Sequence, residues 1–146
     1  MTKEHIQDAV KKVVGDVFQK MYFMFPEALG EDASAPSLPM SCFRAKVRMK
    51  NGPKVVTLYG SEQLVIGMAR NLLGTDHAPK ERDLIDIFKE AANVIAGNLI
   101  VSLTFDGSIR LDIPVAERMQ NCSELETSPG TVFNIDGQFF KLALTE

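Results

Sequence analysis

Apolar residues recur at helical spacing in the first part of the chain. Over residues 4–24 they fall three or four positions apart, which is the period of an amphipathic helix. These positions are Ile6, Val10, Val13, Val14, Val17, Phe18, Met21 and Met24. Pro26 cannot continue a helix, so the pattern predicts one long helix that ends before it. Residues 27–40 contain Pro36, Pro39 and small polar residues, which predicts a connector.

Two β-hairpins follow from runs of strand-forming residues separated by Asn-Gly or Asp-Gly. These dipeptides between β-rich runs favour tight turns with positive φ angles. The predicted hairpins pair residues 41–50 with 53–60 across Asn51-Gly52, and residues 131–135 with 138–144 across Asp136-Gly137.

Two further helices lie between the hairpins. Ser61 is a typical N-cap for a helix that runs to about Leu73, with Gly74 at its end. A longer helix is predicted from near Pro79 to about Thr104. In its first turn Glu81 and Asp83 would complement the helix dipole. After a turn at Asp106-Gly107 we expect a strand over residues 108–113 that ends at Pro114, and a loop over residues 117–130.

This order of elements predicts an α/β fold of the α+β type. Short turns imply a mainly antiparallel sheet, and the long helices would cover it in two layers or more. We expect a single domain over residues 1–146. The recurrence of a helix followed by strands hints at an internal duplication, although no residue-level repeat accompanies it.

Composition excludes several classes of protein. A net charge of −3 without a basic cluster in the sequence argues against a nucleic-acid partner. The longest mostly apolar stretch, residues 94–103, is too short to span a bilayer, so no membrane insertion is expected. The first residues lack an apolar signal segment, and Cys42 and Cys122 show no disulfide or CxxC pattern. We therefore expect a cytoplasmic protein whose cysteines are small buried residues.

Motifs for common chemistries are absent. The sequence has no GxGxxG, Walker A or HExxH motif, so no cofactor or metal is expected on this chain. His5 and His77 both lie in polar surroundings and offer little material for a catalytic triad. Asp83, Asp86 and Glu90 share one helix face, but a solvated acidic face explains them better than a metal site.

The most informative feature is a polar stripe on the third predicted helix. Asp86, Glu90, Asn93 and Gly97 follow each other at spacings of four, three and four, within about 60° on a helical wheel. The opposite face is apolar and consists of Leu84, Phe88, Ala91, Ile95 and Leu99. Asn and Gly each cost roughly 0.6–1 kcal/mol relative to Ala on an exposed helix. A requirement other than helix stability therefore accounts for them.

The pair Glu90 and Asn93 has a specific chemical use. An uncharged amide both donates and accepts hydrogen bonds, so Asn93 is suited to orienting a water molecule for in-line attack on a phosphoryl group. Glu90 would pair with a cation beside that phosphate in a partner's active site. The alternative is a solvated Glu and an Asn that packs the helix, because Glu-x-x-Asn is a common tetrapeptide.

The longer string resembles a known family. Residues 90–98, Glu-Ala-Ala-Asn-Val-Ile-Ala-Gly-Asn, resemble the signature helix of the CheX/CheC family of bacterial chemotaxis phosphatases. That family has Asp or Ser four positions before the Glu, matched by Asp86, and a downstream proline, matched by Pro114. The order of elements also fits, although the specific part of the resemblance is confined to residues 86–114.

The resemblance implies a CheC-like fold and a phosphatase that acts on the phospho-aspartate of a CheY-like receiver. Asn93 would then place the hydrolytic water, and Glu90 would form a salt bridge with the receiver's active-site lysine. Asp86 and Gly97 would support the site, and Pro114 would shape a strand end. Mg²⁺ would belong to the receiver. A homodimer through a sheet edge is also implied, and the apolar C-terminal strand is one that would need covering.

Two departures from the family pattern bear on these expectations. The gap between Asn93 and Pro114 is slightly shorter than is usual in the family, so Pro114 is the weakest assignment. Some relatives carry two active helices, whereas the first helix here offers only Asp16-x-x-Gln19, which is interpreted as a solvated face. One functional site per chain is therefore expected.

Two other hypotheses remain open. A non-catalytic adaptor would bind receivers or flagellar-switch components through the same helix face without changing the phosphate lifetime. A structural module would expose the stripe without binding any receiver.

Overall fold

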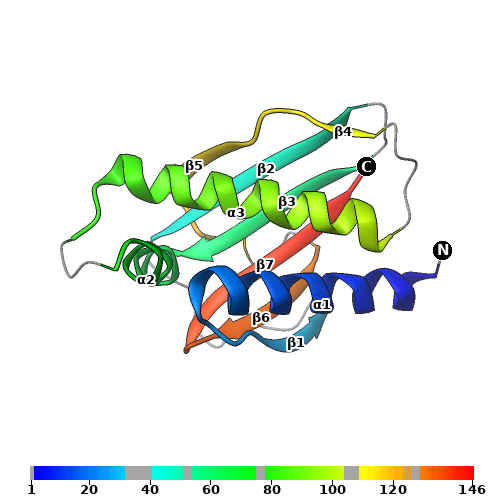
Figure 1. Ribbon diagram of the computed structural model, residues 1–146, viewed down its shortest axis with the longest axis horizontal. Helices are drawn as coiled ribbons and strands as arrows, with labels where there is room; N and C mark the ends of the chain where they lie inside the picture. Colours follow the sequence, from blue (N-terminus) through cyan, green and yellow to red (C-terminus); the bar gives the residue numbers. More distant parts are fainter. Residues whose placement is uncertain are drawn as a thin grey trace.

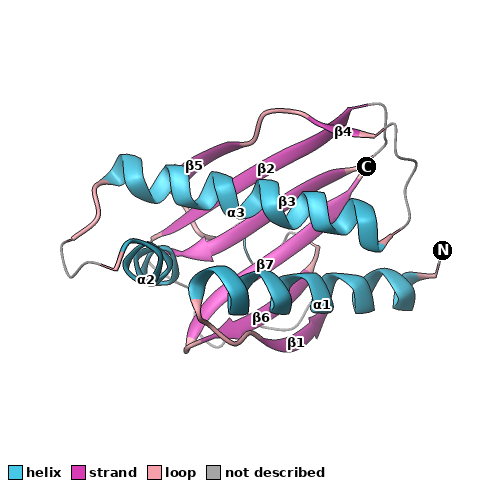
Figure 2. Cartoon of the chain, viewed as in Figure 1, coloured by secondary structure: helices cyan, strands magenta, loops and turns pink. Residues whose placement is uncertain are grey.

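One antiparallel sheet carries three helices on the same face (Figures 1 and 2). The computed structural model describes residues 2–31, 41–50, 54–74, 78–103, 109–123, 125 and 129–146. The helices within these ranges are α1 (Lys3–Tyr22), α2 (Glu62–Leu73) and α3 (Glu81–Ser102). The strands are β1 (Glu27–Glu31), β2 (Cys42–Lys50), β3 (Val55–Ser61), β4 (Arg110–Leu111), β5 (Val115–Met119), β6 (Thr131–Ile135) and β7 (Gln138–Thr145). The predicted α+β class is confirmed.

All three predicted helices form close to their expected bounds. The Ser61 hydroxyl caps α2 by accepting a hydrogen bond from the Leu64 backbone N–H at 3.1 Å. Gly74 ends α2 in the left-handed conformation, with φ of 63°. Asp83 in the first turn of α3 accepts a bond from the backbone N–H of Lys80. No helix in the described ranges combines the length and apolar character that crossing a membrane requires.

The sheet order is β1-β6-β7-β3-β2-β4, and β5 pairs with β2 on the same side as β4. Strands β3 and β7 meet at the centre, and each is flanked by its own hairpin partner, β2 or β6. Strand β1, which follows α1, pairs with β6 of the C-terminal hairpin. Strand β5, which follows α3, pairs in the same way with β2 of the N-terminal hairpin. The units α1-β1-β2-β3 and α3-β5-β6-β7 thus occupy equivalent places, which agrees with the duplication that the element order suggests.

The hairpin predictions are confirmed. Strands β2 and β3 pair antiparallel, and so do β6 and β7. Asp136 and Gly137 have φ angles of 53° and 81°, the positive values that a tight hairpin turn requires. The predicted turns at Asn51-Gly52 and Asp106-Gly107, and the helix end at Thr104, lie outside the described residues.

Two predictions about irregular segments are wrong. Residues 27–31, predicted as part of a connector, form β1 and pair with β6. The strand predicted over residues 108–113 is reduced to the two residues of β4, and β5 begins directly after Pro114 and extends into the predicted loop. Both β1 and β5 are outer strands, whose formation depends on a neighbouring strand more than on their own sequence pattern.

The main core lies between the helices and the sheet. Its largest fully buried side chains include Phe18 of α1, Phe88 of α3 and Phe140 of β7. A smaller apolar cluster lies on the opposite face of the sheet and consists of Cys42, Tyr59, Cys122, Leu125, Val132 and Phe139. Both cysteines are buried and not joined by a disulfide, as predicted for small core residues.

Basic residues gather along strand β2, although the linear sequence shows no basic cluster. Alternation along β2 sets four basic residues, Arg44, Lys46, Arg48 and Lys50, on the face of the sheet away from the helices. Arg44 forms an ion pair with Glu117 of β5, and Lys50 lies 3.8 Å from Asp112. The basic row is therefore partly neutralised, and it was not evident as a cluster in the linear sequence.

Candidate functional site on the third helix

Helix α3 is fixed to the sheet by its apolar face. Leu84, Phe88, Ala91, Ile95 and Leu99, which the sequence predicts as one face, are all buried. Phe88 approaches the backbone of β3 closely at Gly60, where an added Cβ would lie 3.1 Å from the ring. A side chain at position 60 would therefore push α3 away from the sheet, and glycine permits the close packing.

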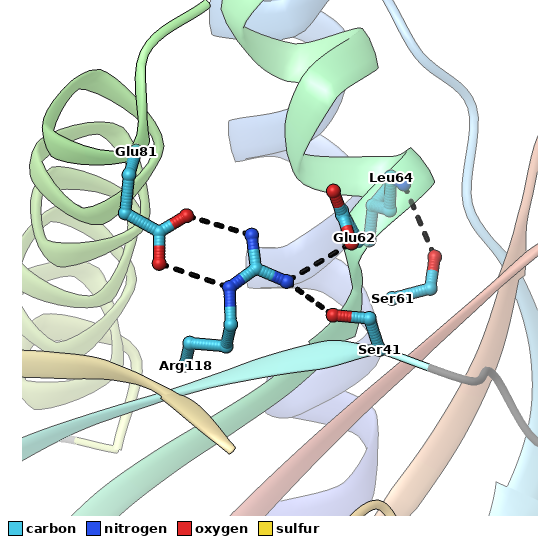
Figure 3. A network of polar contacts seen from close by, with 6 residues as sticks. All are labelled: Ser41, Ser61, Glu62, Leu64, Glu81 and Arg118. Carbon is cyan, nitrogen blue, oxygen red and sulfur yellow. Dashed lines mark hydrogen bonds and ion pairs between the residues drawn. The ribbon is translucent and has the colours of Figure 1, made fainter. Parts of the chain in front are cut away.

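The first turn of α3 is also held by Arg118 of β5 (Figure 3). The guanidinium donates two bonds to the Glu81 carboxylate, at 2.7 and 2.9 Å, in the bidentate geometry that Arg and a carboxylate favour. It also donates to Glu62 at 2.9 Å and to the Ser41 hydroxyl, so it ties together α2, α3 and the strands. Its Cζ lies 4.6 Å from the ring centroid of Phe43, a cation–π contact. We call Arg118, Glu62, Glu81 and Ser41 the arginine clamp.

Electrostatics within the arginine clamp favour the charged forms. Hydrogen bonds from Arg118 lower the pKa of both carboxyl groups, and the Ser41 hydroxyl adds to the effect on Glu62. The same bonds raise the pKa of Arg118. The clamp is a structural anchor, and sequence reasoning missed it because its members are far apart in the chain.

The predicted polar stripe lies on the face of α3 turned away from the core. Asp86 and Glu90 are exposed, while Asn93 and Gly97 are half-buried. None of the described residues forms a hydrogen bond or ion pair with the Asp86 or Glu90 carboxylate. The structure thus confirms the arrangement of the stripe, while the roles assigned to its members stay predictions.

The Asn93 amide differs from the other helical asparagines. Asn98, one turn further along α3, donates to the Val94 carbonyl at 2.8 Å. Asn71 of α2 donates to the Tyr22 carbonyl at 2.7 Å. In contrast, no described residue bonds the Asn93 side chain. Its hydrogen-bonding capacity is therefore available to a group from outside the chain.

Gly97 borders open space. A Cβ built at this position meets no described atom within 4 Å beyond its own helix. Close approach of another described part of the chain therefore does not explain this glycine. Because Gly97 has no side chain, a partner could approach the helix backbone closely beside Asn93.

Tyr22 is the last residue of α1 and is not among the apolar positions that predict this helix. Its side chain is fully buried, its ring packs 5.5 Å from that of Phe18, and its hydroxyl has no hydrogen-bond partner among the described residues. Burial, and to a lesser extent the charge of Glu90, raise the pKa of the Tyr22 phenol.

The remaining candidate residues are dispersed. Pro114 lies between β4 and β5 at the edge of the sheet, a position that suits a role in shaping the strand. Asp16 and Gln19 are both exposed on α1. His5 is exposed at the start of α1, where its backbone N–H bonds the Thr2 hydroxyl, and His77 lies outside the described residues.

The stripe lies on the exposed side of α3, away from a cavity on α1. A cavity of about 320 Å³ lies under the first half of α1, between Lys3, Ile6 and Val10 and the end of β7, and no stripe residue lines it. Among the described residues, no three His, Cys, Asp or Glu side chains gather as a metal site would require. An exposed helix face of this kind is better suited to contact with a macromolecule than to enclosing a small substrate.

Solved structures share this fold over nearly the whole chain. A chemotaxis protein CheX from Desulfovibrio desulfuricans is 16% identical, with 95% of this chain and 97% of that chain covered and a TM-score of 0.67. A CheC-like superfamily protein from Shewanella sp. PV-4 is 13% identical over 100% of both chains, with a TM-score of 0.70. A CheX–CheY–BeF₃–Mg²⁺ complex from Borrelia burgdorferi matches at 14% identity, 98% and 97% coverage and a TM-score of 0.63.

A comparison with curated proteins gave no significant sequence match. A family model does match: the one described as "Chemotaxis phosphatase CheX" covers residues 45–135, which include all of α3 and the polar stripe. Together with the CheC-like fold, this match means that the chain belongs to the CheX family of chemotaxis phosphatases.

Proposed function

We propose that this protein hydrolyses the phospho-aspartate of a CheY-type receiver domain. Asn93 orients the attacking water, and Glu90 docks onto the lysine of the receiver's active site. The observation that carries the proposal is the Asn93 amide, which is half-buried on an anchored helix and bonded to no described residue. The Borrelia burgdorferi complex, in which a CheX with the same fold is combined with CheY, supports the choice of partner.

The proposed reaction requires little chemistry from this chain. The Asn93 carbonyl oxygen accepts a hydrogen bond from a water molecule. This bond aligns the water oxygen with the phosphorus atom. The water oxygen forms the new bond to phosphorus as the bond to the aspartate oxygen breaks, and the protons of the water pass to the phosphate oxygens and the solvent. The products are inorganic phosphate and the free aspartate of the receiver. Rigid positioning is the main contribution, because phosphoryl transfer depends mostly on alignment and charge stabilisation.

The receiver would supply the charges that stabilise the transferring group. Its Mg²⁺ and lysine would neutralise the phosphoryl oxygens, while Glu90, held one turn before Asn93, pairs with the lysine and sets the depth of docking. Asp86, exposed on the same face, adds negative charge that favours the encounter.

The test is the lifetime of the phosphoryl group on a phosphorylated, Mg²⁺-loaded CheY-type receiver from the same organism. Wild-type protein should shorten the lifetime, and Asn93→Ala should remove most of that acceleration. Asn98→Ala is the matched control, because this neighbouring amide is bonded to its own helix. Acceleration that survives Asn93→Ala undiminished would rule out the proposed mechanism.

Two outcomes would favour the other hypotheses. A receiver that binds with no change in its phosphate lifetime would indicate an adaptor that uses the same helix face. Absence of receiver binding, together with neutral substitutions at Glu90 and Asn93, would indicate a structural module.

We also propose that two copies of this chain form a dimer through a sheet edge, but not through the C-terminal strand that the sequence suggests. The C-terminal strand β7 is interior, between β6 and β3, and so is not available to pair with a second copy. The outer strands are β1 on one side and β4 with β5 on the other. Val115 on β5 is 64% exposed, which favours that edge for a two-fold pairing. Static light scattering should show a dimer, and a monomer at micromolar concentration would contradict it.

A further inference from the structure

A group of apolar side chains lies exposed where α1 and α2 end. Phe23 is 69% exposed and Phe25 is 70% exposed, and they are the most exposed aromatic side chains in the described part of the chain. Leu72 and Leu73, in the last turn of α2, are 45% and 54% exposed. We call these four residues the apolar patch. Each costs free energy in water, and none of them contributes to the buried core.

The two segments that carry the apolar patch are held together. The Asn71 side chain donates to the Tyr22 carbonyl at 2.7 Å, which links the end of α2 to the end of α1. Met24 packs against the same helix, since a Cβ added at Gly67 would lie 3.0 Å from the Met24 methyl group. Figure 1 shows the end of α1 beside α2. The patch is therefore a defined surface on packed elements.

Phe23 adopts a backbone conformation that its residue type disfavours. It ends α1 with φ of 57° and ψ of 37°, the left-handed conformation that helix ends usually give to glycine. A residue with a Cβ is strained there, because the Cβ lies too close to the following carbonyl oxygen. Since the Phe23 ring is mostly in solvent, packing offsets little of this strain. A phenylalanine retained under these conditions indicates a use for the exposed ring.

The apolar patch lies at the ends of two helices, α1 and α2, and both of them pack against α3, which carries the polar stripe. Tyr22 immediately precedes Phe23, and the charge of Glu90 acts on its buried phenol. A specific interface covers about 800 Å² on each partner, so a protein docked on Glu90 and Asn93 would also cover the surface around them. Two polar side chains supply only part of the affinity of such an interface, because interfaces typically also contain buried aromatic anchors.

We propose that the apolar patch is a docking site for the same receiver, and that Phe23 and Phe25 bury their rings against apolar side chains flanking its phospho-aspartate. This inference rests on the proposed function. It makes the apolar patch a second source of affinity beside Glu90 and leaves the chemical step to Asn93.

The test separates affinity from turnover and from folding. Phe23→Gly removes the ring and places glycine where the backbone favours it, so the variant should be at least as stable as the wild type. Its half-saturating concentration of phosphorylated receiver should nevertheless rise about tenfold, the effect of losing one aromatic hot spot. The maximal rate should stay within about twofold, because the chemical step does not use the ring.

Phe25→Ala should raise the half-saturating concentration in the same way. Ile113→Ala is the matched control, because Ile113 is 79% exposed but lies before β5, away from α1 and α2. Direct titration of each variant with a receiver carrying beryllofluoride and Mg²⁺ should reproduce the affinity changes without any turnover.

The outcomes are distinguishable. Unchanged affinity in both phenylalanine variants, while Asn93→Ala still abolishes the acceleration, would overturn the docking site and leave the phosphatase proposal intact. A wild-type protein that neither binds nor dephosphorylates the receiver would overturn both. Loss of affinity in Ile113→Ala equal to that in Phe23→Gly would also overturn the docking site, because the effect would not be local.

Discussion

Helices α1 and α3 occupy equivalent places over the sheet, yet their exposed faces are not equivalent. Helix α1 presents Asp16 and Gln19, and α3 presents Glu90 and Asn93 at the same spacing. The acid on α1 is one methylene shorter and its amide one methylene longer. Gln19 is exposed with three side-chain torsions, whereas Asn93 is half-buried with two. An equivalent place in the fold therefore does not make an equivalent site, because side-chain length and restraint decide where the amide is held.

Helix α3 is also anchored by contacts around its first turns. The arginine clamp fixes the first turn of α3, and the Phe88 ring lies against β3 at Gly60. Glu90 and Asn93 follow within about 20 Å of the clamp along the helix axis. A water-positioning group must be held to a fraction of an ångström, so this anchoring is what we expect of the helix that carries the proposed site.

The largest effect on turnover is expected from Asn93→Gln, which gives α3 the same amide side chain that α1 carries at Gln19. Asn93→Gln keeps the functional group but moves it outward by one methylene. Turnover should fall about 100-fold, because a displacement of about 1 Å is sufficient to lose that much positioning. Single-turnover dephosphorylation of the receiver measures it. A variant that retains the wild-type rate would show that the amide's position is not restrictive.

A smaller effect is expected from the corresponding change in the acid. Glu90→Asp keeps the charge but shortens its reach, so the half-saturating receiver concentration should rise about tenfold with a smaller change in maximal rate. Asp16→Glu on α1 is the matched control and should leave both kinetic parameters unchanged. An effect of Glu90→Asp confined to the maximal rate would place Glu90 in the chemical step instead of docking.

Removing the arginine clamp tests the anchoring of α3. Arg118→Met should lower the free energy of unfolding by about 1 kcal/mol, because the bonds are charge-assisted but partly exposed to solvent. Denaturant titration measures it, and Lys54→Met, which breaks the exposed pair with Glu146, should cost less. An equal loss in the two variants would show that the clamp is an ordinary surface pair.

The clamp also predicts a pH dependence. Arg118 lowers the folded-state pKa of Glu62 and Glu81, so its contribution is fully present above the unfolded carboxyl pKa of about 4.3. The contribution is lost as the pH falls through the lowered folded values. The stability difference between the wild type and Arg118→Met should therefore narrow in acid.

Two glycines in equivalent surroundings give a finer test. An added Cβ meets nothing at Gly97 of α3 or at Gly15 of α1. Replacing either by Ala should stabilise the fold by up to about 1 kcal/mol through helix propensity. Only Gly97→Ala should weaken receiver binding, by about threefold, because a partner would meet the new methyl group. Thermal unfolding and receiver titration of both variants decide it, and equal affinities would contradict a role for Gly97 in docking.

The smallest effect is expected on α1 itself. Gln19→Ala should leave receiver dephosphorylation within about twofold of the wild type, because one functional site per chain is proposed. The same assay on the Asn93→Ala background would reveal residual activity from α1. A further loss there would show that both helices act.

The helices, the two hairpins and the polar stripe follow from local patterns in the sequence. Each depends on contacts between residues close in the chain: the apolar period of α3, the Ser61 cap, or the turn at Asp136-Gly137. The 3.6-residue period of a helix fixes which residues share one face, whatever that face packs against. The spacing of Glu90 and Asn93 alone therefore places them side by side. The resemblance to the CheX/CheC family rested on the same local string and is confirmed by the family match.

Features that depend on partners distant in the sequence become visible only in the folded chain. Strand β1 forms because β6 lies beside it, more than 100 residues later, and Arg118 meets Glu81 across 37 residues and Ser41 across 77. The Asn93 amide that no described residue bonds, the space that no described atom fills at Gly97 and the exposed ring of Phe23 are likewise properties of the packed surface. Local periodicity fixes which side chains share a face, but only packing decides what that face meets, because neighbours in space are set by the whole chain.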